Sequence, residues 1–316
     1  MTNQLRFDAA LTKTSEQIDR GLLRAPIIIR NYTKHLTASK GKQIRAMAVL
    51  ACSMDQEGRV HPDAVTFAAA IELLHLATLV HDDVIDNADL RRGRETLQKK
   101  FGKKTAVICG DYLFSAALRL AQDVPDKNKY LNLDMPDYIG KICLGELTQH
   151  LNNGNLDLST RGYLRIIAGK TAALFEASYH AGAILASDSD REHRLYRRLG
   201  YNIGMIFQLT DDCMDFEATI EEAQKPVQSD FEQNVITLPL IHTLHHRIPF
   251  KEKTESGNVT RVEINQAVKE SGGLDFTRMI AKRYYDRSKA ILSQLELTTE
   301  KRELLTQLLD KSYRVG

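Results

Sequence analysis

Apolar residues recur every three or four positions over most of the chain, which is the spacing of one face of an α-helix. Residues 64–86 show the pattern most clearly, at Ala64, Phe67, Ala68, Ile71, Leu74, His75 and Thr78. This stretch is apolar on nearly every side, and such a helix is usually buried at the centre of a larger bundle. The same spacing predicts further helices at 104–122, 136–153, 160–187, 190–218, 235–246, 262–268, 274–296 and 299–312.

Residues that break helices are sparse. The chain has 7 prolines and 18 glycines, and long stretches consist of Ala, Leu, Ile, Glu and Lys, which are good helix formers. Breaks coincide with turn-forming segments such as QEGRVHPD, DVPDKNK and ESGG, none of them long or biased enough to link two domains. The sequence therefore predicts an all-α protein with a single domain over residues 1–316.

Positive and negative charges nearly balance, with 43 Lys and Arg against 41 Asp and Glu and a net charge of +2. No global field points to nucleic acid or to an anionic membrane, so any anion site must be local. The four cysteines lie far apart without C-x-x-C spacing, which favours a reducing compartment. We find no signal-peptide pattern and no apolar run near the ~18 residues of a membrane span. These features predict a cytoplasmic protein with at most peripheral membrane contact.

Two short acidic motifs, HDDVID and TDDCMD, each follow an apolar helical stretch. Their carboxylates are Asp82, Asp83 and Asp86 in the first and Asp211, Asp212 and Asp215 in the second. Residues i and i+4 share a helix face, so Asp82 pairs with Asp86 and Asp211 with Asp215. One such cluster is as readily a solvated helix end as a metal site. Two copies at the ends of apolar helices favour the metal, and hard oxygen ligands suit Mg²⁺.

Basic residues complete the candidate chemistry. Arginine forks bind phosphate oxygens bidentately, so NADLRRGRET directly after the first acidic motif indicates a diphosphate site. His75 lies seven residues before Asp82, nearly two helical turns, and so on the same face. The remaining candidates are more often ordinary surface cations: Lys42 and Arg45 in GKQIR, Lys170 in GKT, and Lys225.

Taken together, GKQIR, IELLHLATLVHDDVIDNADLRRGRET, GDYLFS, GELTQ, GKTAALF and FQLTDDCMDF resemble the trans-prenyltransferase, or polyprenyl synthetase, family from about residue 37 onward. The resemblance implies an isoprenoid synthase helical bundle around a deep central cavity, with the aspartate motifs facing each other across its mouth. It implies a long-chain isoprenyl diphosphate synthase that holds about three Mg²⁺ ions when substrate is bound. Family members are usually homodimers, and some work with a different second subunit.

The resemblance also assigns roles. It implies metal contact by Asp82, Asp86 and Asp211, with support from Asp83, Asp212 and Asp215. It implies that the allylic diphosphate is held by Arg91, Lys170 and Lys225, and isopentenyl diphosphate by Lys42, Arg45, His75 and Arg92. Thr171 and Gln208 match positions that line the reacting carbon. Basic side chains and metal stabilise the departing diphosphate, and the isopentenyl double bond attacks the resulting allylic carbocation.

The chain departs from the family pattern in two places. In KGKQIRA, Lys40, Gln43 and Ala46 replace the usual Gly, Arg and Pro, but the two key cations remain. After the second acidic motif, Asn234 and Val235 stand where Gly and Lys are usual. One cation near the allylic diphosphate is therefore missing, which bears on the rate, on metal affinity, or on the need for a partner chain.

Product length in this family depends on the residues four and five positions before the first aspartate, here Thr78 and Ala77. Both are small, so the sequence predicts an all-trans product longer than farnesyl, with Leu74 or Phe114 as the next barrier. The alternatives are a short- or medium-chain synthase and a regulatory subunit of a heteromeric enzyme. A terpene cyclase is disfavoured, because its second metal motif normally mixes Asn, Ser or Thr with Glu.

Overall fold

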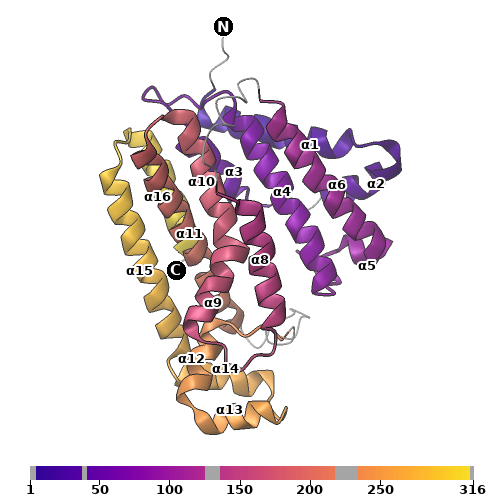
Figure 1. Ribbon diagram of the computed structural model, residues 1–316, viewed down its shortest axis with the longest axis vertical. Coiled ribbons are helices and arrows are strands. Elements are labelled where there is room, and N and C mark those ends of the chain that lie inside the picture. Colours follow the sequence, from indigo (N-terminus) through magenta and orange to yellow (C-terminus); the bar gives the residue numbers. More distant parts are fainter. Residues whose placement is uncertain (1–4, 38–40, 125–135, 218–233, 314–316) are drawn as a thin grey trace. The chain divides into compact units, whose positions relative to one another are not determined.

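The structure, a computed structural model, describes residues 5–37, 41–124, 136–217 and 234–313. The regular secondary structure of these residues is helical apart from one short hairpin and isolated bridges, so the predicted all-α class is confirmed (Figure 1). Two compact units are distinguished by their packing. Unit 1 comprises residues 1–135, 177–197 and 296–305, and unit 2 comprises residues 136–176, 198–295 and 306–316. The single-domain organisation stays a prediction.

Unit 1 is built around one long apolar helix. Its complete elements are α1 (Phe7–Leu23), α2 (Ile27–Thr37), α3 (Ile44–Cys52), α4 (Ala64–Ile85), β1 (Leu90–Arg91), β2 (Arg94–Glu95), α5 (Leu97–Phe101) and α6 (Lys103–Gln122). Helix α4 packs along α6 and also against α3 and α1 (Figure 1). Leu73, Ala77 and Val80 of α4 join Cys109 and Leu113 of α6 in the core.

Helix α4 is long and apolar enough to cross a membrane by length and composition alone. The expectation that no apolar run reaches this length was therefore wrong, because α4 carries only one charge, Glu72, before the aspartates at its C-terminal end. A core helix of a globular protein passes the same test. The burial of Ala68, Ala69, Leu73 and Ala77 fits that role, as the sequence predicts for the centre of a bundle.

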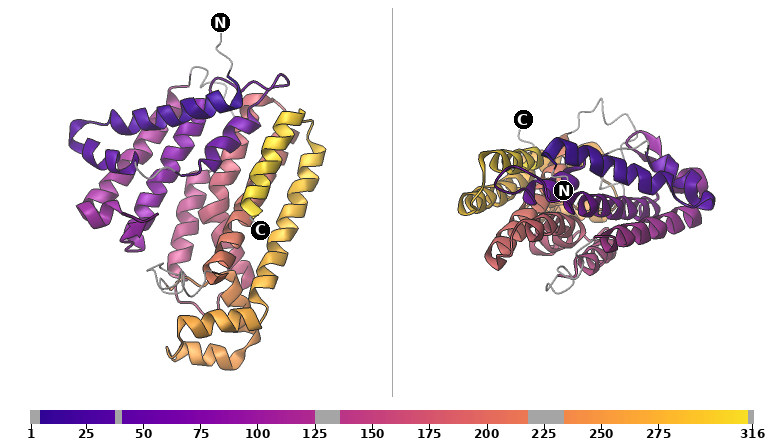
Figure 2. Two further views of the ribbon diagram at one scale, coloured as in Figure 1. Left: turned by 180° about the vertical axis from the view of Figure 1, so that it is seen from behind. Right: turned by 90° about the horizontal axis from the view of Figure 1, so that it is seen from above.

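Unit 2 contains α8 (Tyr138–Leu151), α9 (Thr160–Ile167), the π-helical turn η1 (Ala168–Ala172), α12 (Leu238–His246), α13 (Ile248–Glu255), α14 (Arg261–Glu270) and α15 (Gly273–Gln294). Three more helices contribute residues to both units: α10 (Ala173–Ala186), α11 (Asp190–Glu217) and α16 (Thr299–Tyr313). Within unit 2, α15 lies beside the second half of α16, where Tyr285 and Tyr313 stack at 4.6 Å (Figure 2).

All nine predicted helical stretches are present within a few residues. Helix α12 begins at Leu238 and not at 235, because Pro239 belongs in a first helical turn. The stretch 160–187 is helical but contains the π-helical turn η1, which its periodicity does not reveal. The pattern missed α1, α2, α3, α5 and α13, of which the last three are at most nine residues long.

Candidate active site

One face of α4 holds the first group of candidates. His75, Thr78, Asp82 and Asp86 follow one another at spacings of three and four residues and are all half-buried. Each residue rises ~1.5 Å along the axis, so His75 and Asp82 lie about 10 Å apart along the helix. Asp83 points elsewhere and is only 6% exposed. The carboxylates of Asp82 and Asp86 are thus presented together, as the sequence predicts.

Asp83 is held by the hairpin that follows α4. Arg91 Nε donates to Asp83 Oδ1 at 2.7 Å. Burial nevertheless raises the pKa of Asp83, against the lowering effect of Arg91. The hairpin turn is Arg92-Gly93 with φ of 52° and 73°, the positive pair that a two-residue type I′ turn requires. RRGR therefore forms a hairpin, and Arg91 supports the first acidic motif through Asp83.

Arg45, His75 and Arg92 come together beside α4. Arg45 Nη1 lies 3.1 Å from His75 Nε2, and the Arg92 guanidinium lies over Gly41, where a Cβ would be 3.1 Å from Nη1. Burial lowers the pKa of Arg45 to about 10, so it stays charged near neutral pH. Burial, with Arg45, Arg91 and Arg92 nearby, holds the pKa of His75 well below its ordinary value. His75 is therefore neutral and accepts from Arg45, which leaves a cationic cluster suited to an anion.

Two departures from the family pattern have local partners in unit 1. Ala46 N–H donates to Glu72 Oε1 at 2.9 Å, a bond that the usual proline could not make. Gln43 adopts φ of 50° at the start of α3 and accepts from Ser15 Oγ at 2.9 Å. These bonds fix the segment between Gly41 and Arg45, and Lys42 is exposed within it.

Lys170 lies in unit 2 on η1, where α8 comes unusually close. Its ammonium is 2.9 Å from Glu146 Oε1 of α8. A Cβ on Gly145 would lie 2.3 Å from the backbone nitrogen of Lys170 and 2.6 Å from the carbonyl carbon of Gly169. Glycine at 145 therefore lets the two backbones touch, and π-helical turns of this kind are frequent at functional sites.

Replacing Gly145 with alanine should destabilise the protein by about 1–3 kcal/mol, because the new methyl meets backbone that cannot rotate away. Thermal unfolding of Gly145→Ala checks this. Gly21→Ala is the matched control, since a Cβ there makes only an ordinary contact at 3.6 Å with Leu73. Equal melting temperatures for the two variants would contradict the close packing of α8 on η1.

In unit 2, a chain of hydrogen bonds links three candidate residues to one another and to a tyrosine. Thr171 Oγ1 donates to Gln208 Oε1 at 2.8 Å, and Gln208 Nε2 donates to Asp212 Oδ1 at 2.9 Å. The hydroxyl of Tyr163 donates to Asp212 Oδ2. Asp212 is only 1% exposed, whereas Asp211 is exposed and Asp215 half-buried. In the second motif, the Asp212 carboxylate is therefore buried and hydrogen-bonded, while Asp211 and Asp215 are at least partly accessible to solvent.

Tyr163→Phe should raise the metal concentration needed for half-maximal turnover several-fold, because Asp212 would lose a donor that holds it in place. Tyr285→Phe is a matched control that removes a similar bond, from the Tyr285 hydroxyl to Asp310 at 2.8 Å. A metal titration of turnover for both variants checks the effect. The same metal dependence in both would show that Tyr163 has a structural role only.

The structure does not describe residues 218–233, so Lys225 lies outside the described residues. Asn234 has φ of 60°, and its carbonyl accepts from Gly154 N–H at 2.6 Å. Asparagine is among the few residues that tolerate this left-handed conformation, which explains how it replaces the usual glycine. Val235, in contrast, supplies no cation at the position where lysine is usual.

The two residues predicted to limit product length face different surroundings. Ala77 is 2% exposed and packs with Leu73 and Val80 in the core against α6. Thr78 is half-buried on the face of His75 and Asp82, and its hydroxyl donates to the His75 carbonyl at 2.8 Å. Leu74 and Phe114, the predicted further barriers, border the same core cluster as Ala77.

The carboxylates have the chemistry that Mg²⁺ prefers but do not form a complete cage. Among the described residues, no three His, Cys, Asp or Glu side chains converge as a metal site. Mg²⁺ commonly takes only one or two protein carboxylates and completes its octahedron with water and substrate phosphate. Asp82 with Asp86, and Asp211 with Asp215, fit that kind of partial site.

Sequence reasoning missed three residues that hold the candidates in place: Glu72, Glu146 and Tyr163. Glu72 carries a readable signal, because it is a charge within an otherwise apolar stretch, three residues before His75. Burial raises its pKa, while Ala46 N–H, Arg45 and Arg92 favour its charged form. Nothing in the sequence around Tyr163 distinguishes it from a core tyrosine.

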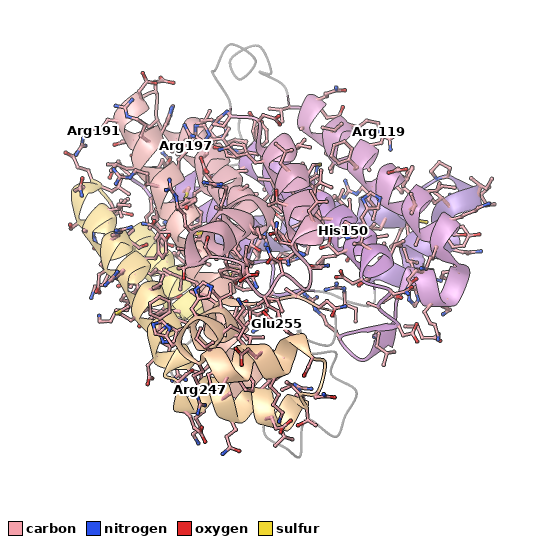
Figure 3. All side chains as sticks on the ribbon, turned by 60° about the horizontal axis from the view of Figure 1, so that its bottom comes forward. Arg119, His150, Arg191, Arg197, Arg247 and Glu255 are labelled. Carbon is pink, nitrogen blue, oxygen red and sulfur yellow. The ribbon has the colours of Figure 1, made fainter. Side chains whose placement is uncertain are left out.

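A surface pocket of about 520 Å³ lies between α13 and α14 of unit 2. Arg247, labelled in Figure 3, lines it and pairs with Glu270 at 3.0 Å. Lys253 and Glu263 form a second ion pair on its wall at 2.5 Å. Within the described part of the chain, none of the predicted site residues lines this pocket.

An all-α fold with two aspartate motifs and a half-buried arginine–histidine pair is typical of enzymes that act on prenyl diphosphates. The chain belongs to the polyprenyl synthetase family, whose sequence pattern matches residues 26–271. It is 34% identical over 287 residues to the octaprenyl diphosphate synthase of Escherichia coli, covering 88% of this chain and 87% of that protein. It is 33% identical over 306 residues to heptaprenyl diphosphate synthase component 2 of Geobacillus stearothermophilus, covering 94% and 93%.

Solved structures agree with this assignment. The heptaprenyl diphosphate synthase of Staphylococcus aureus matches with a TM-score of 0.87 and 30% identity over 99% of both chains. A polyprenyl synthase of Caulobacter crescentus, solved with calcium and isoprenyl diphosphate, matches with a TM-score of 0.83 and 29% identity over 98% of this chain and 95% of that one. The family resemblance read from the motifs is confirmed.

Proposed function

We propose that this chain is a long-chain all-trans polyprenyl diphosphate synthase, which adds isopentenyl diphosphate head to tail onto an allylic diphosphate. The observation that carries the proposal is the face of α4. His75 on this face lies beside Arg45 of α3 and Arg92 of the hairpin, and the carboxylates of Asp82 and Asp86 follow about two and three turns further along. A cationic cluster beside a metal-binding carboxylate pair suits substrates that carry diphosphates.

The residues of unit 1 would hold isopentenyl diphosphate. Arg45 and Arg92 supply fixed positive charge, and the neutral ring of His75 keeps Arg45 in place from the side. Because Arg45 is half-buried, its attraction to a phosphate is screened less than that of a surface cation. Lys42, exposed next to this cluster, would add a further donor.

The residues of unit 2 would act on the allylic substrate. Lys170 offers an ammonium to its diphosphate, and the hydroxyl of Thr171 is oriented by Gln208 and Asp212. As the allylic C–O bond breaks, negative charge grows on the departing diphosphate and cations stabilise it. The isopentenyl double bond then attacks the carbocation, and loss of a proton restores a double bond. The departing diphosphate is the base we favour for that proton.

Magnesium is the metal that this donor set fits. Asp82 with Asp86 in unit 1, and Asp211 with Asp215 in unit 2, would each hold metal, and Asp83 and Asp212 would fix the two motifs through Arg91 and Tyr163. Bound Mg²⁺ supplies positive charge to the diphosphate leaving group. The structure in complex with calcium and isoprenyl diphosphate from C. crescentus supports a divalent metal in this family.

A long product is supported by the small side chains of Ala77 and Thr78 and by several relatives. The chain is 32% identical over 290 residues to an all-trans-nonaprenyl-diphosphate synthase of Rhodobacter capsulatus, covering 90% of this chain. The second candidate is a shorter product, because a geranylgeranyl diphosphate synthase of Sulfolobus acidocaldarius is also 32% identical, over 83% of this chain. Homodimeric assembly and a cytoplasmic location remain our proposals.

A heteromeric synthase with a second, different subunit is the alternative to homodimeric assembly. The G. stearothermophilus relative is called component 2 of its enzyme, which suggests a synthase of more than one chain. Val235 stands where lysine is usual, so a partner chain could supply the missing cation. A regulatory role alone is disfavoured, because both acidic motifs are intact.

Incubating the purified chain with farnesyl diphosphate, labelled isopentenyl diphosphate and Mg²⁺ tests the proposal. Chromatography of the dephosphorylated products should show prenols longer than geranylgeraniol, and chelation of the metal should abolish them reversibly. Geranylgeraniol as the end product would support the second candidate. Failure to elongate with any allylic starter, alone or with a candidate partner subunit, would overturn the proposal.

A further inference from the structure

The corner between α1 and α2 exposes apolar side chains that the fold does not need. Ile27 and Ile28 are 82% and 84% exposed, the largest values among the exposed large hydrophobic residues in the described part of the chain. Leu23, one turn earlier at the end of α1, is 45% exposed. Single exposed apolar residues need no explanation, but three around one turn form a patch.

Core packing and hydrogen bonds hold the turn between α1 and α2 in place. Leu22, Ala25 and Ile29 are buried in the core of unit 1. Thr33 Oγ1 donates to the Leu22 carbonyl at 2.7 Å, and Arg30 Nε donates to the Ala25 carbonyl at 3.0 Å. The buried neighbours of these residues anchor the turn. The side chains of Leu23, Ile27 and Ile28 are therefore held on its outer side.

The surroundings of the patch are strongly basic although the whole chain is nearly neutral. Residues 20–54 contain no Asp or Glu, and the α1–α2 corner carries Arg20, Arg24, Arg30 and Lys34. Helix α2 lies beside α5 and the start of α6, as Figures 1 and 2 show, with Tyr32 packed on Phe101 at 5.0 Å. That second segment, residues 97–110, adds Lys99, Lys100, Lys103 and Lys104, also without an acid.

Some negative charge lies near this surface. Lys99 is paired with Asp89 at 2.8 Å, and Asp19, Glu95 and Asp111 flank the two basic segments in the sequence. The basic side chains still outnumber these carboxylates. An apolar tip surrounded by cations matches a lipid surface, in which acyl chains lie beneath anionic headgroups.

We propose that the basic corner, defined as Leu23, Ile27 and Ile28 with Arg20, Arg24, Arg30 and Lys34, docks on an anionic lipid bilayer. The two isoleucines enter the headgroup region, and the arginines contact lipid phosphates. Under the proposed function, this contact brings the enzyme to the phase in which a long prenyl tail dissolves. The docking itself requires no substrate, so its test is independent of turnover.

Co-sedimentation of the full chain with vesicles tests the proposal. We compare phosphatidylcholine vesicles with vesicles that also contain phosphatidylglycerol. Binding should be about tenfold or more stronger to the anionic vesicles and should fall as salt is raised. Ile27→Ser with Ile28→Ser should weaken binding about tenfold or more, since the two apolar side chains that would enter the bilayer are lost. Arg20→Gln with Arg24→Gln should weaken it and reduce its dependence on salt.

The matched control is Ile248→Ser with Val262→Ser, which changes side chains 57% and 62% exposed in unit 2 and should bind like the unchanged protein. Circular dichroism establishes that each variant is folded. The proposal fails if the unchanged protein stays in the supernatant, or if the Ile27 and Ile28 variant binds as well as the control. A lower mass for that variant alone in sedimentation velocity would instead identify the corner as a contact between protein chains.

Discussion

Replacing Asp82 with alanine is expected to reduce turnover about 10²- to 10³-fold, even at saturating Mg²⁺. Asp82 and Asp86 share one face of α4, one turn apart, so they repel each other unless a cation lies between them. Under the proposed function, removing one carboxylate removes half of this pair and would leave the metal poorly placed against the diphosphate. Steady-state elongation of farnesyl diphosphate, measured over a range of Mg²⁺ concentrations, checks the prediction.

Asp82→Asn should behave like the alanine variant, because it keeps the shape of the side chain and removes the charge. The control is Asp286→Ala, which breaks an exposed ion pair with Lys282 at 3.1 Å, worth at most about 1 kcal/mol. It should leave turnover unchanged. Full activity of Asp82→Ala at saturating Mg²⁺ would show that the first acidic motif does not hold metal, whatever the family relationship suggests.

The parts of this molecule that were predictable from sequence are those fixed by neighbours in the chain. Helix α4 follows from an apolar pattern longer than twenty residues, and the pairing of Asp82 with Asp86 follows from helical geometry alone. The helices α1 and α2 were missed because polar and charged residues interrupt their apolar positions. Each helix buries only a narrow stripe, which includes Leu22 in α1 and Ile29 in α2.

Contacts between distant residues could not be predicted. Tyr163 reaches Asp212 across 49 residues, and Lys170 meets Glu146 across 24. Each contact depends on how helices pack within unit 2. The residues next to each partner in the sequence do not indicate the contact. The hairpin after α4 is an intermediate case, since Arg92-Gly93 is a weaker turn signal than Asn-Gly. Its basic residues were identified as site candidates, but the ion pair of Arg91 with Asp83 was not.

Exchanging Ala77 or Thr78 for phenylalanine should shorten the product, because either ring adds bulk about one turn before Asp82. The structure distinguishes the two positions. Thr78 shares the half-buried face of His75 and Asp82, so Thr78→Phe should stop elongation early at little cost in stability. Ala77 packs in the core against α6, so Ala77→Phe should also lower stability by about 1–3 kcal/mol.

Product chromatography and thermal unfolding of both variants separate these effects, with Leu118→Phe, a 44% exposed residue on α6, as the control for bulk alone. Shortening by Thr78→Phe with unchanged melting would place the growing chain along the face of the metal site. Shortening by Ala77→Phe alone would mean that the chain grows between α4 and α6, where Leu74 and Phe114 border the core and would set the next limit. If neither variant changes the product distribution, product length is set elsewhere, and the small residues at 77 and 78 merely let α4 pack closely.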